Sequence, residues 1–398
     1  MSHCNQKKPA TTSAHAEATK FRLSTLAAAT IAVLLGAPAM AAPSLEQQVE
    51  QLGKEVDELK QEVAKQKSAH GGSGATSIGG YGELHYNNLD SKDEIDFHRF
   101  VLFFGHRFNE QIRFFSELEL EHALVKDTSN ASGPGEVELE QAYLDFDLND
   151  AHTARAGLFL IPVGILNETH EPPTFYGVER NPVETNIVPT TWWEGGLGLN
   201  GRFGTGFGYD LALTSGLKVP TSGSSAYKVR DGRQKVAKAD ANNAAVTARI
   251  KWTGAPGVEL ATTVHRQDAI AQGTVADSVS GAATLWEAHA VLARGPFGLR
   301  ALYAQWDLDG TGPQALGRDE QTGWYVEPSF KLTPKFGVFA RFNEWDNEAG
   351  NATDSEKRQT DVGFNYWPHE QVVLKFDIQR QSGTANDDGF NLGLGYMF

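Results

Sequence analysis

The sequence after residue 76 predicts one closed membrane barrel of sixteen antiparallel β-strands. Three observations support this all-β fold class. Apolar and polar residues alternate with a period of two, as expected for strands with one apolar and one polar face. The connections between strand candidates are mostly short and long in turn, which is typical of outer-membrane barrels. Strands of about ten residues at a steep tilt also match the hydrocarbon thickness of a bilayer.

The first 42 residues resemble an export signal. Four basic residues precede an apolar run at 23–36, and Ala39-Met40-Ala41 is a cleavage pattern. The alternative is a true membrane anchor, but the apolar run is shorter than the roughly 20 residues that a spanning helix needs. We therefore predict a signal peptide at 1–42. The chain's single cysteine, Cys4, lies within it, so the mature chain would contain no disulfide.

Residues 43–68 predict a short periplasmic coiled coil. Their apolar residues follow spacings of four and three, which place one seam on a helix: Leu45, Val49, Leu52, Val56, Leu59 and Val63. We favour self-association through this seam. The alternative is a solitary amphipathic helix that lies on the barrel or on the membrane. Residues 69–77 (AHGGSGATS) predict a flexible Gly/Ser linker.

The barrel region, 78–398, contains sixteen strand candidates. In one of them Leu374, Phe376 and Ile378 alternate with Lys375 and Asp377. The candidates are 78–87, 94–108, 112–125, 136–148, 154–165, 195–204, 206–216, 242–253, 258–269, 283–294, 297–308, 322–333, 336–346, 358–368, 371–382 and 388–398. Aromatic residues near strand ends are expected to form the interfacial girdles: Tyr81, Trp252, Trp286, Tyr303, Trp324, Tyr366 and Tyr396.

The longest connection is 166–194, LNETHEPPTFYGVERNPVETNIVPTTWWE. Its four prolines exclude a ladder strand or a long helix. Its aromatic and apolar residues require a packing partner, so it is not a disordered linker. We expect this connection to fold into the barrel and to narrow the channel. Six of its residues are candidates for the constriction: Glu168, His170, Glu171, Glu179, Arg180 and Glu184.

Several segments of the sequence resemble a known family. Four features are similar to those of the porin O and P family, whose members are called phosphate-selective porins. They are the coiled coil before the barrel, "GGYGELHY", "RNPVETNIVPTTWWEGGLGL" and the terminal "GYMF". The resemblance covers 77–398. It implies a sixteen-stranded barrel, a homotrimer and a third extracellular loop folded into the lumen. The terminal Phe398 resembles the assembly signal of outer-membrane proteins.

The charge pattern departs from that family, whose phosphate-selective members line the pore with arginines and lysines. Connection 166–194 contains five glutamates, one arginine and no lysine. Eleven acids and eight bases are predicted to face inward, which does not favour anion selectivity. The candidate pore-lining residues are Arg113, Glu117, Glu119, Arg155, Arg249, Lys251, Arg341 and Lys375.

One basic cluster lies in the connection at 217–241: Lys218, Lys228, Arg230, Arg233, Lys235 and Lys238. It could gather anions at the mouth or contact lipopolysaccharide, or it could be a solvated loop face. The twelve histidines are scattered, and His98, His106 and His122 are interpreted as lumen or interface residues rather than metal ligands.

The sequence therefore predicts an outer-membrane porin of a Gram-negative bacterium, a water-filled channel for passive diffusion of small hydrophilic or charged solutes. Lipid and lipopolysaccharide would surround it. We expect no enzyme activity, cofactor or metal, and a net charge of −15 disfavours nucleic acid. One alternative is an uptake channel selective for oxyanions. The other is a structural outer-membrane protein tethered through its coiled coil.

Overall fold

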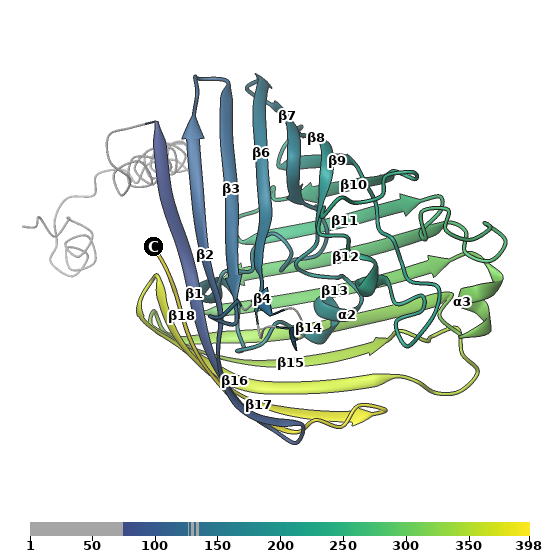
Figure 1. Ribbon diagram of the computed structural model, residues 1–398. Coiled ribbons are helices and arrows are strands. Elements are labelled where there is room, and N and C mark those ends of the chain that lie inside the picture. The colour runs from purple at the N-terminus through teal and green to yellow at the C-terminus, as the bar shows by residue number, and fades with distance from the viewer. Residues whose placement is uncertain (1–74, 126, 129–130, 133–134) are drawn as a thin grey trace, which may run out of the picture. The chain divides into compact units, whose positions relative to one another are not determined.

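The computed structural model describes residues 75–125, 127–128, 131–132 and 135–398. The predicted signal peptide at 1–42 and coiled coil at 43–68 lie outside these residues. The described chain forms a closed barrel in which each strand pairs with its neighbours along the sequence, and β1 pairs with β18 to complete the ring (Figure 1). All neighbouring wall strands are antiparallel. The predicted sixteen-stranded barrel is confirmed.

The wall strands are β1 (Thr76–Leu89), β2 (Lys92–Arg107), β3 (Ile112–Glu121), β6 (Val137–Asn149), β7 (His152–Leu160), β8 (Trp193–Phe203), β9 (Phe207–Thr214), β10 (Ala245–Trp252), β11 (Val258–Gln267), β12 (Ala283–Arg294), β13 (Phe297–Leu308), β14 (Glu320–Thr333), β15 (Phe336–Asp346), β16 (Lys357–His369), β17 (Val372–Gly383) and β18 (Gly389–Met397). The connections contain β4 (Asp127–Thr128), β5 (Ala131–Ser132), η2 (Pro172–Thr174), α2 (Pro182–Asn186), η3 (Val229–Gly232) and α3 (Thr311–Ala315). Because β1 begins at Thr76, it includes the last two residues of the predicted linker at 69–77. None of the helices in the described residues combines the length and the apolar sequence needed to cross a bilayer.

The period-two pattern separates the two faces of the wall as predicted. On β17, Leu374 and Ile378 are 43% exposed, whereas Lys375 and Asp377 are 4% and 2% exposed. An antiparallel strand turns successive side chains to opposite faces, so apolar residues cover the outside of the barrel. Charged residues consequently project into the lumen.

The two ends of the barrel differ in the length of their connections. Tight turns join β12 to β13 and β14 to β15, and Gly295 supplies the left-handed conformation (φ 59°) that the first of these turns requires. The connections at the other end include the long segments 161–192 and 215–244. The first connection at that end is an exception, because only residues 90–91 separate β1 from β2.

The barrel closes where the C-terminus meets β1. The backbone N–H of Gly80 donates to the Phe398 carbonyl at 2.9 Å, and the Phe398 N–H donates to the Gly80 carbonyl at 2.9 Å. A Cβ atom at Gly80 would lie 2.2 Å from the Val101 carbonyl oxygen, so only glycine fits. The Phe398 residue is 55% exposed.

Part of the lumen is filled by an apolar core, which the sequence analysis did not predict. Two connections, 161–192 and 215–244, pack side chains against inward-facing residues of β12 to β15. Trp192 and Trp306 lie at its centre and are both 0% exposed. Figure 1 shows α2, which contributes Val183, within the ring of strands. The inner wall is therefore dry over part of its surface, and not water-lined throughout.

One aromatic residue expected in the interfacial girdles lies inside the barrel. Tyr81 is 0% exposed, and its ring lies 6.0 Å from that of His170. On this part of β1 the odd-numbered residues face inward: Gly79, Tyr81 and Glu83. The position of Tyr81 near a strand end therefore does not place it in a girdle. Trp286 and Tyr303 face outward and are 53% and 46% exposed, as a girdle residue should be.

The apolar core predicts that Trp306 stabilises the inserted connections. Its indole N–H donates to the Ile187 carbonyl at 2.9 Å. Trp306→Ala should cost about 3–5 kcal/mol through the cavity it leaves. We expect a lower melting temperature in detergent and faster proteolysis within 161–192.

Trp286→Ala is the matched control, because Trp286 belongs to the neighbouring strand and faces outward. It should leave the proteolysis rate unchanged. Equal sensitivity of the two variants would contradict the proposed packing role of Trp306.

Candidate pore and its lining

Connection 161–192 joins β7 to β8 and extends across the lumen to the opposite wall. Four successive backbone carbonyls of this segment each accept a hydrogen bond from an inward-facing side chain. In order, the carbonyls of Thr174, Phe175, Tyr176 and Gly177 bind Arg300 on β13 (2.8 Å), Asn365 on β16 (2.9 Å), Arg341 on β15 (3.2 Å) and Lys375 on β17 (2.8 Å). The next residue, Val178, donates its N–H to Asp377 on β17 at 2.7 Å.

The sequence explains why side chains must supply these partners. Pro172 and Pro173 prevent the segment from joining a β-ladder or extending a helix. Buried backbone carbonyls still need donors, because an unpaired one costs about as much as a lost hydrogen bond. Cations on the wall therefore fix the path of this segment through the lumen.

Glu184 holds the second half of the connection. Asn181 caps α2, and its side-chain oxygen accepts from the Glu184 N–H at 2.8 Å. The Glu184 carboxylate accepts from the N–H groups of Ile165 (2.8 Å) and Leu166 (2.6 Å) and from the Tyr325 hydroxyl (2.7 Å). Burial raises the pKa of this carboxyl above its ordinary value despite these donors. Glu184 is 0% exposed, so it does not face a solute as the sequence analysis expected.

The basic cluster at 217–241 also binds this connection. Arg230 donates to the carbonyls of Thr185 (2.5 Å) and Thr190 (3.1 Å), and Arg233 donates to the Thr191 carbonyl at 2.6 Å. Burial, and secondly the charge of Arg233, lower the pKa of Arg230 to about 10. These two guanidinium groups therefore contact protein inside the barrel and do not form a solvated face of the loop.

Lys235, from the same cluster, pairs with Glu136 at 2.5 Å and with Glu138. The pKa of this ammonium group is raised, because the two carboxylates outweigh the opposing effect of burial. The basic connection is thus attached both to 161–192 and to the β6 wall.

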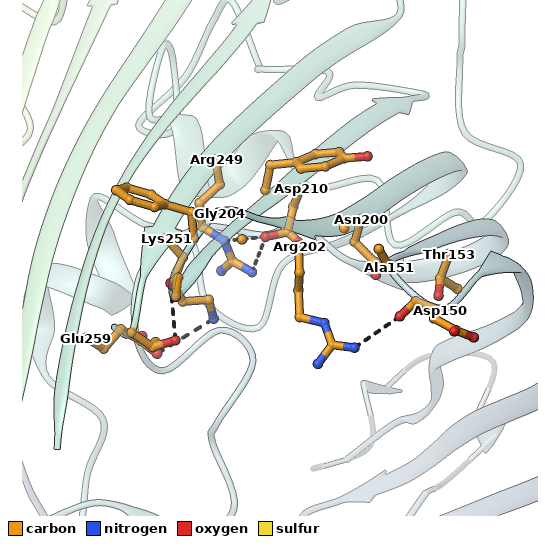
Figure 2. A pocket seen from close by; sticks show the side chains of 16 residues that line it. Asp150, Ala151, Thr153, Asn200, Arg202, Gly204, Asp210, Arg249, Lys251 and Glu259 are labelled. Carbon is orange, nitrogen blue, oxygen red and sulfur yellow. Dashed lines mark hydrogen bonds and ion pairs between the residues drawn. The ribbon is translucent and has the colours of Figure 1, made fainter. Parts of the chain in front are cut away.

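Open space remains at the short-turn end of the barrel. A cavity of about 770 Å³ is lined by β7 to β11 and the turns from β6 onward, and Figure 2 shows its side chains. A second cavity of about 370 Å³ shares Arg249, Lys251 and Glu259 with the first and continues to Glu168 and Arg300. Together the two cavities reach from the turns to connection 161–192.

Charges of both signs line this path in equal number. Four cationic side chains (Arg202, Arg249, Lys251 and Arg300) accompany four carboxylates (Asp150, Glu168, Asp210 and Glu259). Arg249 pairs with Asp210 at 2.8 Å and with Glu168, while Lys251 lies 3.8 Å from Glu259. Although burial opposes it, the charge of Arg249 lowers the pKa of the Glu168 carboxyl.

The other predicted lining residues lie in ion pairs on the wall. Arg113 pairs with Asp147, and Arg155 donates to Asp145 at 2.8 Å and 3.0 Å. Both arginines keep part of their surface exposed (33% and 25%). The remaining predicted lining residues, Glu117, Glu119, Arg341 and Lys375, face inward and are almost fully buried.

Comparison with known proteins identifies the family. The sequence profile described as "Phosphate-selective porin O and P" matches residues 77–387. The chain belongs to this porin family. An uncharacterized protein of Aquifex aeolicus (strain VF5) is 30% identical in an alignment of 368 positions, which covers 81% of this chain and 80% of that protein.

Two solved structures share the barrel fold of this porin. An anion-selective porin from Comamonas acidovorans has a TM-score of 0.54 at 12% identity, covering 81% of this chain and 99% of that chain. The trimer form of in-vitro folded OmpT from Vibrio cholerae has a TM-score of 0.53 at 11% identity, with the same coverage. The family identifies the chain as an outer-membrane channel, and the two neighbours share its barrel fold.

Within the porin, the six predicted constriction residues divide into two groups. Glu168 and Glu179 keep 35% of their side-chain surface exposed, and Glu171 and Arg180 are half-buried. His170 is buried against Glu117, with 3.4 Å between Nε2 and the carboxylate oxygen, as Glu184 is buried against Tyr325. Burial of the side chain, which alternation cannot reveal, separates the two groups.

Several charged residues near the lumen were not recognised from the sequence, among them Asp210 and Arg99. Asp210 lies on the short strand β9, where glycine and alanine obscure the alternation. Arg99 pairs with Glu83 at 2.8 Å and with Glu119 at 3.2 Å. Neither position carries a sequence motif, so only the pairing of strands brings these groups to their partners.

The contacts of Glu184 generate a prediction. Glu184→Ala would leave two backbone N–H groups without acceptors, each costing about 1–3 kcal/mol. Connection 161–192 should loosen, and single-channel conductance should rise and become noisier.

Glu184→Gln should be milder, because the amide oxygen can still accept hydrogen bonds. Glu171→Ala is the control on the same connection, at a half-buried acid. Conductance of Glu184→Ala indistinguishable from that of Glu171→Ala would refute the anchoring role.

Proposed function

We propose that this porin forms a water-filled channel for passive diffusion of small hydrophilic or charged solutes, with connection 161–192 setting the size limit. One observation carries the proposal: the backbone of 174–177 is bound to side chains on four wall strands inside the lumen. A segment held in this way reduces the open cross-section. The cavities of about 770 Å³ and 370 Å³ beside it supply the route for solutes.

We further propose that the channel has weak charge selectivity. Four bases and four carboxylates line the two cavities, so their fields largely cancel. Several lumen cations, including Arg341 and Lys375, already donate to backbone carbonyls and to carboxylates. This use of cations argues against the alternative of an oxyanion-selective channel, although the neighbour from Comamonas acidovorans is described as anion-selective.

The selectivity proposal predicts opposite effects of two neutralising substitutions. Lys251→Gln removes a positive charge from the cavity and should shift the reversal potential towards cations. Glu259→Gln removes a negative charge from the same ion pair and should shift it towards anions. The measurement is single-channel recording in a planar bilayer under a salt gradient, with and without added phosphate.

Arg266→Gln is the control, because Arg266 lies on β11 with 54% of its side chain exposed, outside the lumen. Its reversal potential should equal that of the unmodified porin. Strong anion preference of the unmodified porin, with block by phosphate, would favour the oxyanion channel. Absence of any conductance from folded protein would favour the structural role.

We also propose that the porin assembles as a homotrimer in the outer membrane, surrounded by lipid and lipopolysaccharide. An apolar groove of about 490 Å³ on the outer face, beside the β1–β18 closure, supports this proposal. Its lining includes Leu84, Tyr86, Phe364, Phe376 and Leu394. The OmpT neighbour is described as a trimer form. The assignment of Phe398 as an assembly signal stays a prediction.

The molar mass of the protein particle tests the proposed trimer. Multi-angle light scattering of the porin in detergent should give three chains per particle. Leu394→Glu places a charge in the groove and should shift the particle towards the monomer, whereas a monomeric unmodified porin would refute the proposal.

A further inference from the structure

Three histidines meet on the inner face of β1 and β2. The rings of His85 and His98 are stacked at 4.8 Å between centroids, and the His122 ring lies edge-on to His98 at 5.4 Å. One carboxylate oxygen of Asp96 lies 3.0 Å from Nδ1 of His98 and 2.7 Å from Nδ1 of His122. Asp96, His98 and His122 keep 21%, 26% and 36% of their side chains exposed, so the group is open to water.

A β-bulge brings His98 to this position. Along the β1–β2 pair, Glu83 pairs with Arg99 and His85 pairs with Asp96, so Phe97 and His98 together face the single residue Leu84. Strict alternation would place His98 and Arg99 on opposite faces of the wall. The bulge instead lets both side chains reach the lumen, and bulges often re-aim a side chain beside a functional site.

The backbone of His122 is also unusual. It follows β3 with φ 52°, in the left-handed region that few residues other than glycine adopt. Its N–H donates to the His98 carbonyl at 3.1 Å, which holds the backbone of His122 beside β2, and its Nδ1 lies 2.7 Å from Asp96. A residue held in such a conformation suggests a function for its side chain.

The local charge favours a cation. Arg99 pairs with Glu83 and Glu119, and the imidazoles contact Asp96 and Glu179. These contacts join four carboxylates to one guanidinium group. A divalent ion would offset most of the excess negative charge.

We propose that Asp96, His98 and His122 bind one divalent transition-metal ion of the Zn²⁺ type. Two imidazoles and a carboxylate suit Zn²⁺, Cu²⁺ and Ni²⁺, whereas Ca²⁺ and Mg²⁺ prefer oxygen ligands. The three ligand atoms lie within 4.8 Å of one another. A tetrahedral ion with bonds of about 2.0–2.2 Å needs ligand atoms about 3.3 Å apart. The contact of Asp96 with His98 (3.0 Å) must therefore open by about 0.3 Å, and its contact with His122 (2.7 Å) by about 0.6 Å. Water from the lumen fills the fourth position.

His85 is a weaker candidate ligand than His122. Both of its ring nitrogens already face carboxylates, Nδ1 at 3.0 Å from Glu179 and Nε2 at 3.3 Å from Glu83. Arg99 donates to Nε2 of His98 at 2.9 Å. A neutral imidazole that binds metal at Nδ1 carries its proton on Nε2, so the Nδ1 proton moves to Nε2 through solvent and the contact with Arg99 breaks, while Arg99 keeps Glu83 and Glu119.

The test is metal titration of the untagged, folded porin in detergent. Calorimetry with Zn²⁺ and the visible absorption of bound Co²⁺ should both show one ion per chain. His122→Asn and His98→Asn should each weaken binding at least about tenfold. His122 lies in a connection outside the wall strands, so its variant is expected to fold even if His98→Asn does not.

His106→Asn is the matched control, because His106 lies on the same strand and bonds Thr76 instead of this group. It should bind the ion like the unmodified porin. Absence of saturable binding, or unchanged binding by His122→Asn, would overturn the proposal. Weakened binding by His85→Asn but not by His122→Asn would also overturn it, and would assign the ion to His85 and Glu179.

Discussion

Inward-facing side chains bind the backbone of connection 161–192, and the rest of the lumen depends on this interaction. The segment contains five prolines and cannot satisfy its carbonyls through a ladder. The wall therefore supplies Arg300, Asn365, Arg341 and Lys375 as donors from four separate strands. Once the segment is fixed there, its apolar residues can pack with Trp306 and exclude water from part of the interior.

This arrangement changes the meaning of the lumen charges. A guanidinium group that donates to protein carbonyls and pairs with carboxylates, as Arg341 does with Glu327 and Asp361, contributes little free positive field. Arg230 and Arg233 are engaged in the same way. Selectivity then depends on the smaller set of charges around Arg249 and Lys251, where acids and bases alternate. Counting charged residues by face overestimates the number that a solute encounters.

Alternation along the sequence predicted the wall well, because each strand has lipid on one side and the lumen on the other. All sixteen strands and the inserted long connection could be found in this way. The apolar core could not, since it requires side chains of 161–192 and 215–244 to meet β12 to β15. For the same reason the burial of His170 and Glu184 could not be predicted: their partners Glu117 and Tyr325 are remote in sequence.

Alternation also fails at register shifts within the wall, one of which lies at Phe97 and His98. The bulge there changes which face each residue occupies, so a period-two pattern misplaces the residues on one side of it. On its other side β2 pairs without interruption with β3 from Arg99 to Arg107, and the bulge lies just beyond this pairing. The irregularity places His98 between His85 and His122 and beside Asp96. A departure from regular pairing that gathers ionisable groups in this way is more easily explained by ligand binding than by barrel stability.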